Sequence, residues 1–121
     1  MQIALIGTGN LATHLASALQ NSKTTDLVQW IGRKNTAPKQ ANKGLYFKQY
    51  QNDIKTDLCF IAVTDDAIPS VAEQLINIDV LVVHTAGATS INALKPIKRR
   101  GVFYPLQSFK KNFHFDWSST P

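Results

Sequence analysis

Short runs of apolar residues alternate along the chain with stretches whose apolar positions recur every three or four residues. The runs are apolar almost throughout rather than at every second position, which is typical of strands buried on both faces of a parallel sheet. We therefore predict strands at residues 2–6, 27–31, 45–47, 58–63, 80–84 and 101–104.

Helices are predicted between these strands. The clearest one follows the first strand, where leucines recur at every fourth position from Leu11 to Leu19 and alanines lie beside them on a narrow apolar face. A second helix is predicted over residues 67–76 from its apolar spacing, with Asp65 and Asp66 capping the free N–H groups at its start.

Two further stretches are weaker helix candidates because each contains a proline: residues 36–43 and 90–98. Six strands joined by crossovers predict the α/β class, as a doubly wound, mainly parallel six-stranded sheet with helices on both faces. Ligands of such sheets bind beyond the carboxyl ends of the strands, so candidate site residues are expected there.

The composition is that of one globular domain, because 44% of the 121 residues are hydrophobic and 17% are charged. The net charge of +5 suits an anionic ligand but is too small to predict nucleic-acid binding by itself. A single cysteine excludes an internal disulfide and favours a reducing, cytoplasmic location. The start of the chain lacks the pattern of a signal peptide, and the apolar runs are too short for a membrane span.

The first strand leads into a turn that opens the first helix and reads Gly7, Thr8, Gly9, Asn10, Leu11, Ala12. This is the G-x-G-x-x-[GA] pattern of dinucleotide-binding domains, in the strand–turn–helix context that the pattern requires. Gly7 allows the tight turn, Gly9 lets the backbone approach a pyrophosphate, and Ala12 lets the helix pack closely on the strand. We predict that Gly7 through Leu11 bind the cofactor, over the alternative of a purely structural turn.

The end of the second strand predicts which dinucleotide is bound. NAD-specific domains place an acid about 20 residues after the glycines to hold the ribose hydroxyls, but this chain has Arg33 and Lys34 there and no acid. An arginine can form forked hydrogen bonds with a 2′-phosphate, and Lys34 adds a second positive charge. We therefore predict NADP rather than NAD; the alternative is a solvated turn with ordinary surface bases.

The end of the fifth strand carries two polar candidates. His84 could donate a proton to a carbonyl or imine as hydride arrives, and the alternative is a hydrogen-bonded structural histidine. Thr85 is placed to bond the nicotinamide end of the cofactor. The three histidines and the one cysteine lack metal-ligand spacing, so no metal site is predicted.

These motifs make the sequence similar to the N-terminal Rossmann-like domain of bacterial oxidoreductases whose second, helical domain has no known function. More distantly, the chain resembles pyrroline-carboxylate reductase and the deazaflavin-dependent NADP reductases. The resemblance is carried by IALIGTGNLATHL at 3–15, IGRK at 31–34, FIAVTDDAI at 60–68, HTAGATS at 84–90 and GVFYPLQSF at 101–109.

The resemblance implies a dinucleotide-binding domain at residues 1–108 and a tail at 109–121 that leads to a C-terminal domain absent from this chain. In the family that domain carries dimerisation and part of the cleft, so a homodimer formed through it is expected. Many relatives have His where this chain has Tyr104, and any role of that His is not carried over. The resemblance further implies that three residues line the ribose and adenine side of the cofactor: Ala62, Val63 and Thr64.

The leading functional prediction is the NADP-binding part of an oxidoreductase that transfers hydride to or from a small carbonyl or imine substrate. This chain alone is expected to bind cofactor without turning over substrate. The alternative is a non-enzymatic dinucleotide-sensing module, although such sensors usually keep the ribose acid that is missing here. Nucleic-acid binding through Lys98, Arg99 and Arg100 or through Lys110 and Lys111 is disfavoured, because no aromatic residues are interleaved with these bases.

Overall fold

The computed structural model describes residues 1–32, 38–39, 41, 46–47, 54–75, 79–86 and 89–103. In chain order the elements are β1 (Gln2–Ile6), α1 (Asn10–Asn21), β2 (Asp26–Ile31), β3 (Tyr46–Phe47), β4 (Leu58–Ile61), the 3-10 helix η1 (Asp65–Ala67), α2 (Ile68–Glu73), β5 (Leu81–His84), the 3-10 helix η2 (Ile91–Leu94) and β6 (Arg100–Val102).

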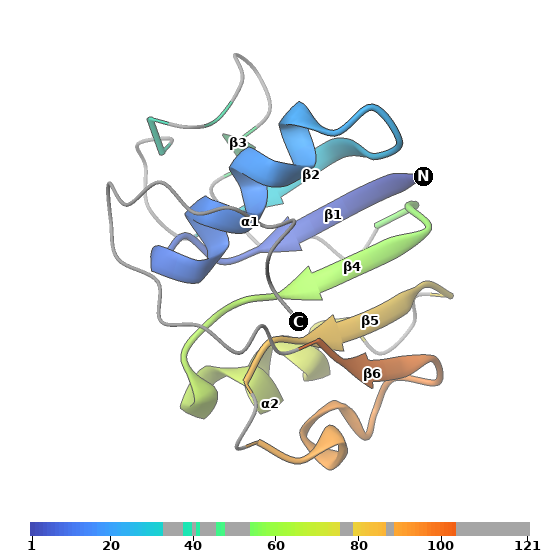
Figure 1. The fold of residues 1–121 in the computed structure, drawn as a ribbon. Helices are drawn as coiled ribbons and strands as arrows, with labels where there is room; N and C mark the ends of the chain where they lie inside the picture. Colours follow the sequence, from blue (N-terminus) through green and yellow to red (C-terminus); the bar gives the residue numbers. More distant parts are fainter. Residues whose placement is uncertain are drawn as a thin grey trace.

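The strands form one sheet in the order β3-β2-β1-β4-β5-β6, and every neighbouring pair is parallel (Figure 1). The predicted α/β class with a parallel sheet is therefore confirmed. The six strands are unequal, because β3 supplies only two residues while the others have three to six. The two halves of the sheet meet between β1 and β4, because the chain builds β1 to β3 on one side and then crosses over to add β4 to β6 on the other. The segments that follow β1 and β4 therefore leave the sheet on opposite sides.

Both faces of the sheet are buried, which explains why its strands are apolar at successive positions. Ile3 and Leu5 of β1 belong to the core cluster that includes the buried side of α1. Ala4 and Ile6 belong to the second cluster, which includes α2 and η2. Helical elements therefore cover the sheet from both sides, as the apolar runs predicted.

The helix α1 buries most of the apolar face that the sequence predicted, but Leu11 and Ala18 are only half-buried. Its buried residues are Ala12, Leu15, Ala16 and Leu19. The two alanines on this face are fully buried, so the helix backbone lies close to the sheet. This close packing fixes the start of α1 beside the end of β1, where the glycine turn joins them.

Two helix predictions need correction. The stretch predicted as a helix over 67–76 is a 3-10 turn followed by the short α2, and no side chain forms a cap hydrogen bond at the start of either. The expected capping by Asp65 and Asp66 is therefore wrong; both carboxylates lie in the first turn of η1. Only η2 forms within the predicted helix 90–98, and its start is capped by the Ser90 hydroxyl.

Most of the other weak helix candidate, residues 36–43, lies outside the described residues. Tyr104, Lys110, Lys111 and the rest of the tail at 109–121 lie outside them entirely. The predicted boundary between domain and tail is therefore not tested by the structure.

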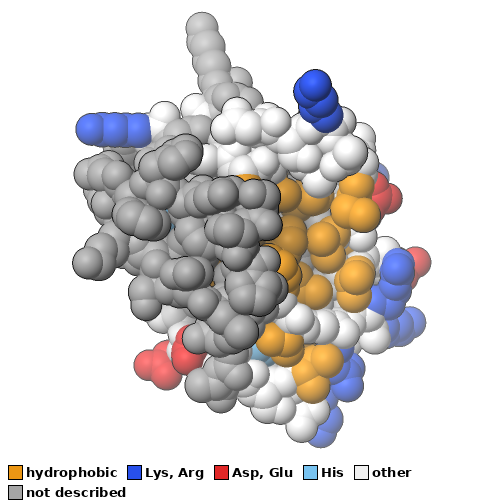
Figure 2. All heavy atoms as spheres, in the orientation of Figure 1, with side chains coloured by type: hydrophobic (Ala, Val, Ile, Leu, Met, Phe, Trp, Pro, Cys, Tyr) orange, Lys and Arg blue, Asp and Glu red, His pale blue; other side chains and the backbone are white. Residues whose placement is uncertain are grey.

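Apolar side chains are visible on the face of the sheet that carries α1. Figure 2 shows them gathered to the right of the centre of this view, with charged side chains around the edge. Leu58 and Leu81 are half-buried there, and Phe103 remains 38% exposed although its ring packs edge-on against Phe60 at 5.5 Å between ring centres. The helices that the structure describes thus leave part of this apolar face uncovered.

Cys59 is a buried core residue of β4. Burial raises the pKa of its thiol to about 12, because the thiolate would be poorly solvated in the core. The thiol therefore stays protonated at neutral pH and does not act as a nucleophile or ligand. Among the described residues, no three His, Cys, Asp or Glu side chains group together as a metal site would require.

None of the helices in the described part of the chain is long and apolar enough to cross a membrane.

Candidate functional site

A pocket of about 710 Å³ opens where the strands end, beside the switch in strand order between β1 and β4. It is formed by the glycine turn, the start of α1 and the segments that follow β2, β4 and β5. The residues that line it are Gly7, Thr8, Gly9, Asn10, Leu11, Ala12, Gly32, Ala62, Val63, Thr64, Asp65, Ala67, Thr85 and Ala86.

The structure brings the predicted cofactor-binding residues together. Every one of them that the structure describes lines this pocket: Gly7, Thr8, Gly9, Asn10, Leu11, Ala62, Val63, Thr64 and Thr85. Because β4 ends at Ile61 rather than at residue 63, Ala62 and Val63 belong to the loop that borders the pocket. Arg33 and Lys34 lie outside the described residues, but they directly follow Gly32, which does line the pocket.

Gly7 has a backbone conformation that only glycine adopts easily. Its φ is +124°, and a Cβ placed on it would lie 2.0 Å from the carbonyl oxygen of Ala62. Its N–H donates to the carbonyl of Ile31 at 2.9 Å, and its own carbonyl accepts from the Trp30 indole N–H at 2.7 Å. The turn is thus held tightly between the ends of β2 and β4.

Gly9 serves a different purpose from Gly7. It is the N-cap residue of α1 with an ordinary φ of −77°, and its carbonyl accepts the N–H of Thr13 at 2.9 Å. A Cβ placed on Gly9 would meet no atom within 4 Å. The protein itself therefore does not require glycine here, and the open space beside Gly9 belongs to the pocket.

The start of α1 gives the pocket a partial positive charge. No side chain forms a cap hydrogen bond at Gly9, and the first turn of the helix carries no acid. The dipole of this 12-residue helix and its first N–H groups therefore favour an anion. The described residues that line the pocket include no Lys, Arg or His. Among these residues, the attraction for an anion therefore comes from the backbone N–H groups at the start of α1.

Some residues that line the pocket were not predicted to bind the cofactor: Ala12, Gly32, Asp65, Ala67 and Ala86. Asp65 and Ala86 lie after β4 and β5, where the strand-end rule does predict candidate site residues. Asp65 was instead predicted to cap the next helix, and Ala86 was given no role. Asp65 has an exposed side chain and lines the pocket on the side where β4 ends. Its carboxylate disfavours an anion at that end of the pocket. A phosphate is therefore better accommodated at the α1 end of the pocket.

His84 is fully buried at the end of β5 and does not line the pocket. Its Nδ1 accepts the N–H of Ala86 at 3.1 Å, so the proton of the neutral ring lies on Nε2. Nε2 is 3.2 Å from the carbonyl oxygen of Ser90 and can donate to it. Both ring nitrogens therefore bind the loop after β5, which favours the structural alternative for this histidine.

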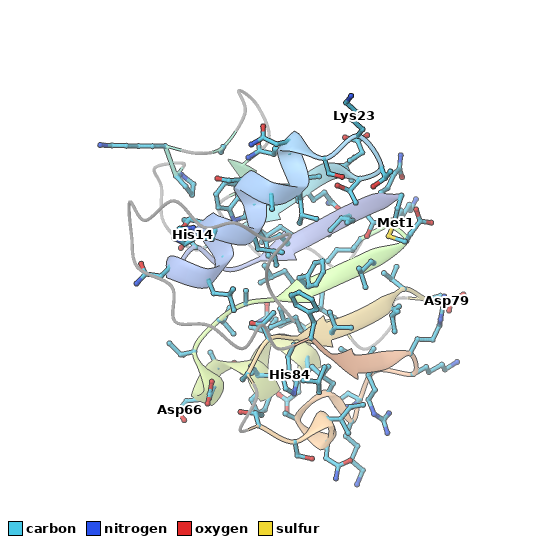
Figure 3. All side chains as sticks on the ribbon, in the orientation of Figure 1. Met1, His14, Lys23, Asp66, Asp79 and His84 are labelled. Atoms are coloured by element: carbon cyan, nitrogen blue, oxygen red, sulfur yellow. The ribbon has the colours of Figure 1, made fainter. Side chains whose placement is uncertain are left out.

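Thr85, unlike its neighbour, faces the pocket while being 94% buried, that is, 6% exposed. Its hydroxyl donates to the carbonyl of Ile61 at 3.4 Å across the ends of β4 and β5. The lone pairs of the Thr85 hydroxyl oxygen stay available to accept a hydrogen bond from a ligand. In Figure 3, His84 and Asp66 lie on the side of the sheet where the strands end, whereas Met1 and Asp79 lie on the opposite side, where the strands begin.

Comparison with known proteins agrees with this architecture. A dimeric ketopantoate reductase from Staphylococcus aureus has a similar structure, with a TM-score of 0.58 and 24% sequence identity over 93% of this chain. The fold is of the Rossmann type. This chain spans 46% of the length of that reductase. No protein-family model and no curated protein sequence matches the chain, so its membership of the bacterial oxidoreductase family stays a prediction.

Proposed function

We propose that this chain is the NADP-binding domain of an oxidoreductase that transfers hydride to or from a small carbonyl or imine. The observation that carries the proposal is the pocket, in which the glycine turn, the open space at Gly9 and the uncapped start of α1 meet. Its volume of about 710 Å³ is within the range common for small-molecule sites. The Rossmann-type fold that it shares with a ketopantoate reductase adds support.

Each part of the pocket has a role in this proposal. The N–H groups from Gly9 to Leu11 would hold the pyrophosphate, and the loop from Ala62 to Thr64 would pack against the ribose and adenine side. The hydroxyl of Thr85 would accept a hydrogen bond from the nicotinamide carboxamide. When bound, the nicotinamide supplies or receives the hydride.

The choice of NADP over NAD rests on Arg33 and Lys34, which directly follow the pocket residue Gly32. If Arg33 binds the 2′-phosphate, Arg33→Ala is expected to weaken NADPH binding by about 1.5–3 kcal/mol, the range of a charged hydrogen bond. The affinity for NADH should hardly change, because NADH lacks that phosphate. Titrations of cofactor fluorescence would measure both affinities.

A matched control removes one positive charge elsewhere. Lys23 is exposed and does not line the pocket, so Lys23→Ala is expected to leave both affinities unchanged. Equal losses of NADPH and NADH in Arg33→Ala would mean that Arg33 is structural. If the unmodified chain binds neither NADPH nor NADH, or prefers a DNA oligonucleotide, the proposed function is wrong.

For His84 we propose the structural role, with catalysis as the alternative. His84→Ala would leave the Ser90 carbonyl and the Ala86 N–H without these partners and would open a cavity. We expect a loss of about 2–4 kcal/mol in the free energy of unfolding, measured by urea denaturation. His84→Gln, which keeps an acceptor and a donor, should recover part of the loss. A stability change below about 0.5 kcal/mol in His84→Ala would contradict the structural role.

The groups that select the substrate belong, in this proposal, to a further domain. The chain spans 46% of the ketopantoate reductase, which is described as dimeric, and we propose a homodimer formed through that domain. The partly uncovered apolar face with Leu58, Leu81 and Phe103 is consistent with packing against additional structure.

Saturable NADPH oxidation by this chain alone, tested on small ketones, aldehydes and cyclic imines, would contradict this division of roles between the two domains. A dinucleotide sensor remains the alternative if the complete protein also shows no turnover.

A further inference from the structure

Trp30, near the end of β2, is a buried aromatic residue whose side chain forms a hydrogen bond with the glycine turn. Its side chain is fully buried in the cluster that includes the inner face of α1. An indole has one polar atom, and a buried indole N–H normally needs an acceptor. Here the acceptor is the carbonyl oxygen of Gly7, at 2.7 Å.

The backbone of β2 provides a second hydrogen bond to the same glycine. The Gly7 N–H donates to the carbonyl of Ile31 at 2.9 Å, so two successive residues of β2 bind the two polar groups of Gly7. The register explains this arrangement: Leu5 of β1 pairs with Trp30 and Ile6 pairs with Ile31, which leaves Gly7 just beyond the paired region. The Trp30 hydrogen bond therefore continues the link between β1 and β2 into the turn.

The hydrogen bond from the Trp30 indole to the Gly7 carbonyl also affects the direction of the N–H group of Thr8. The described chain contains no cis peptide bond, so the N–H of Thr8 points opposite to the carbonyl of Gly7 within their shared peptide plane. That carbonyl points at the buried indole, so the Thr8 N–H points away from it. Thr8 lines the pocket, and a carbonyl that accepts a hydrogen bond makes the N–H of its own peptide a stronger donor.

We propose that Trp30 is a positioning residue for the pyrophosphate: its indole N–H fixes the Gly7–Thr8 peptide so that the Thr8 N–H donates to a phosphate oxygen in the pocket. The inference rests on the proposed dinucleotide function and adds a residue outside the glycine motif to it. The glycine pattern allows the turn to form, and Trp30 selects one orientation of its first peptide.

The test compares ligands that do and do not carry a pyrophosphate. Trp30→Phe keeps an aromatic ring in the core but removes the N–H donor. Its affinity for NADPH and for ADP is expected to fall about tenfold, the effect of losing one charge-assisted hydrogen bond. Its affinity for adenosine 2′-monophosphate, which has no pyrophosphate, should change less than about twofold. Isothermal titration calorimetry would measure all three.

A second variant isolates the N–H from the shape of the ring. Trp30→β-(3-benzothienyl)alanine, introduced by codon suppression, replaces the N–H with sulfur and keeps the bicyclic shape, so the core is preserved if Trp30→Phe does not fold. In 15N-labelled wild-type protein, ADP should move the Thr8 amide proton downfield. In the benzothienyl variant this shift should be much reduced at saturating ADP.

The outcomes separate the two proposals. If wild-type protein binds neither NADPH nor ADP, the dinucleotide function is wrong and the role of Trp30 with it. If wild-type protein binds both and the benzothienyl variant binds them equally well, only the role of Trp30 is wrong. An equal loss for all three ligands would also overturn it, since the indole would then support the domain in general rather than the pyrophosphate.

Discussion

Gly9→Val is expected to weaken NADPH binding by at least about 100-fold while the domain remains folded. The open space beside the Gly9 Cα would be filled by the valine side chain, next to the N–H groups at the start of α1. A phosphate could then no longer approach those N–H groups, and the loss of several charge-assisted hydrogen bonds accounts for the size of the effect. Fluorescence titration with NADPH would measure the affinity.

The fold should tolerate this substitution because the protein makes no use of the space. Gly9 has an extended backbone with φ −77° and ψ −168°, which β-branched residues adopt readily, and no atom lies within 4 Å of the added Cβ. We expect the free energy of unfolding to change by less than about 1 kcal/mol. Gly9→Ala, with a smaller side chain, should lose an intermediate amount of affinity. Unchanged NADPH affinity in folded Gly9→Val would place the pyrophosphate elsewhere.

The glycine turn and the core strands could be predicted because their signals are local in the sequence. A strand buried on both faces of a parallel sheet is apolar at nearly every position, and β1 and β4 have this pattern. The leucine and alanine spacing of α1 likewise follows from one face packing on the sheet. The pocket then follows from topology, because the carboxyl ends of parallel strands meet at one edge.

The hydrogen-bond partners of buried side chains could not be predicted in this way. The loop atoms bound by His84 lie at Ala86 and Ser90, and only the folded course of that loop brings them to the ring. Trp30 and Gly7 are 23 positions apart and meet because β1 and β2 are neighbours with a particular register. Sequence patterns give the face on which such a residue lies but not the atom that it bonds.

The capping of α2 was mispredicted for a related reason. Asp and Glu near a helix start are favourable through the helix dipole even when no hydrogen bond forms, so their presence does not identify the cap residue. Asp65 and Asp66 instead begin a 3-10 turn that precedes α2. In the predicted helix 90–98, Pro96 follows shortly after η2, where the chain leaves the helical conformation.

Gly7→Ala is expected to destabilise the domain strongly, by about 3–5 kcal/mol, and to reduce dinucleotide binding only as a consequence. A φ of +124° is strained for any residue with a Cβ, and that Cβ would lie 2.0 Å from the carbonyl oxygen of Ala62, which is backbone and cannot rotate away. Relief requires the turn to move away from β4, which breaks the hydrogen bonds that Gly7 forms with Ile31 and Trp30. Urea denaturation followed by circular dichroism would measure the loss.

Gly101→Ala provides the matched control for the Gly7→Ala prediction. A Cβ at Gly101 would approach a side-chain methyl group of Val83 at 3.2 Å, and this flexible contact can adjust by a few tenths of an ångström. We expect Gly101→Ala to change stability by less than about 1 kcal/mol. The two glycines of the turn should respond differently to substitution. Gly9→Val should lower the affinity for NADPH while the free energy of unfolding is retained, and Gly7→Ala should lower the free energy of unfolding, with binding reduced only as a consequence. If Gly7→Ala were as stable as Gly101→Ala, the tight turn between β1 and α1 would not have the backbone conformation on which the pocket depends.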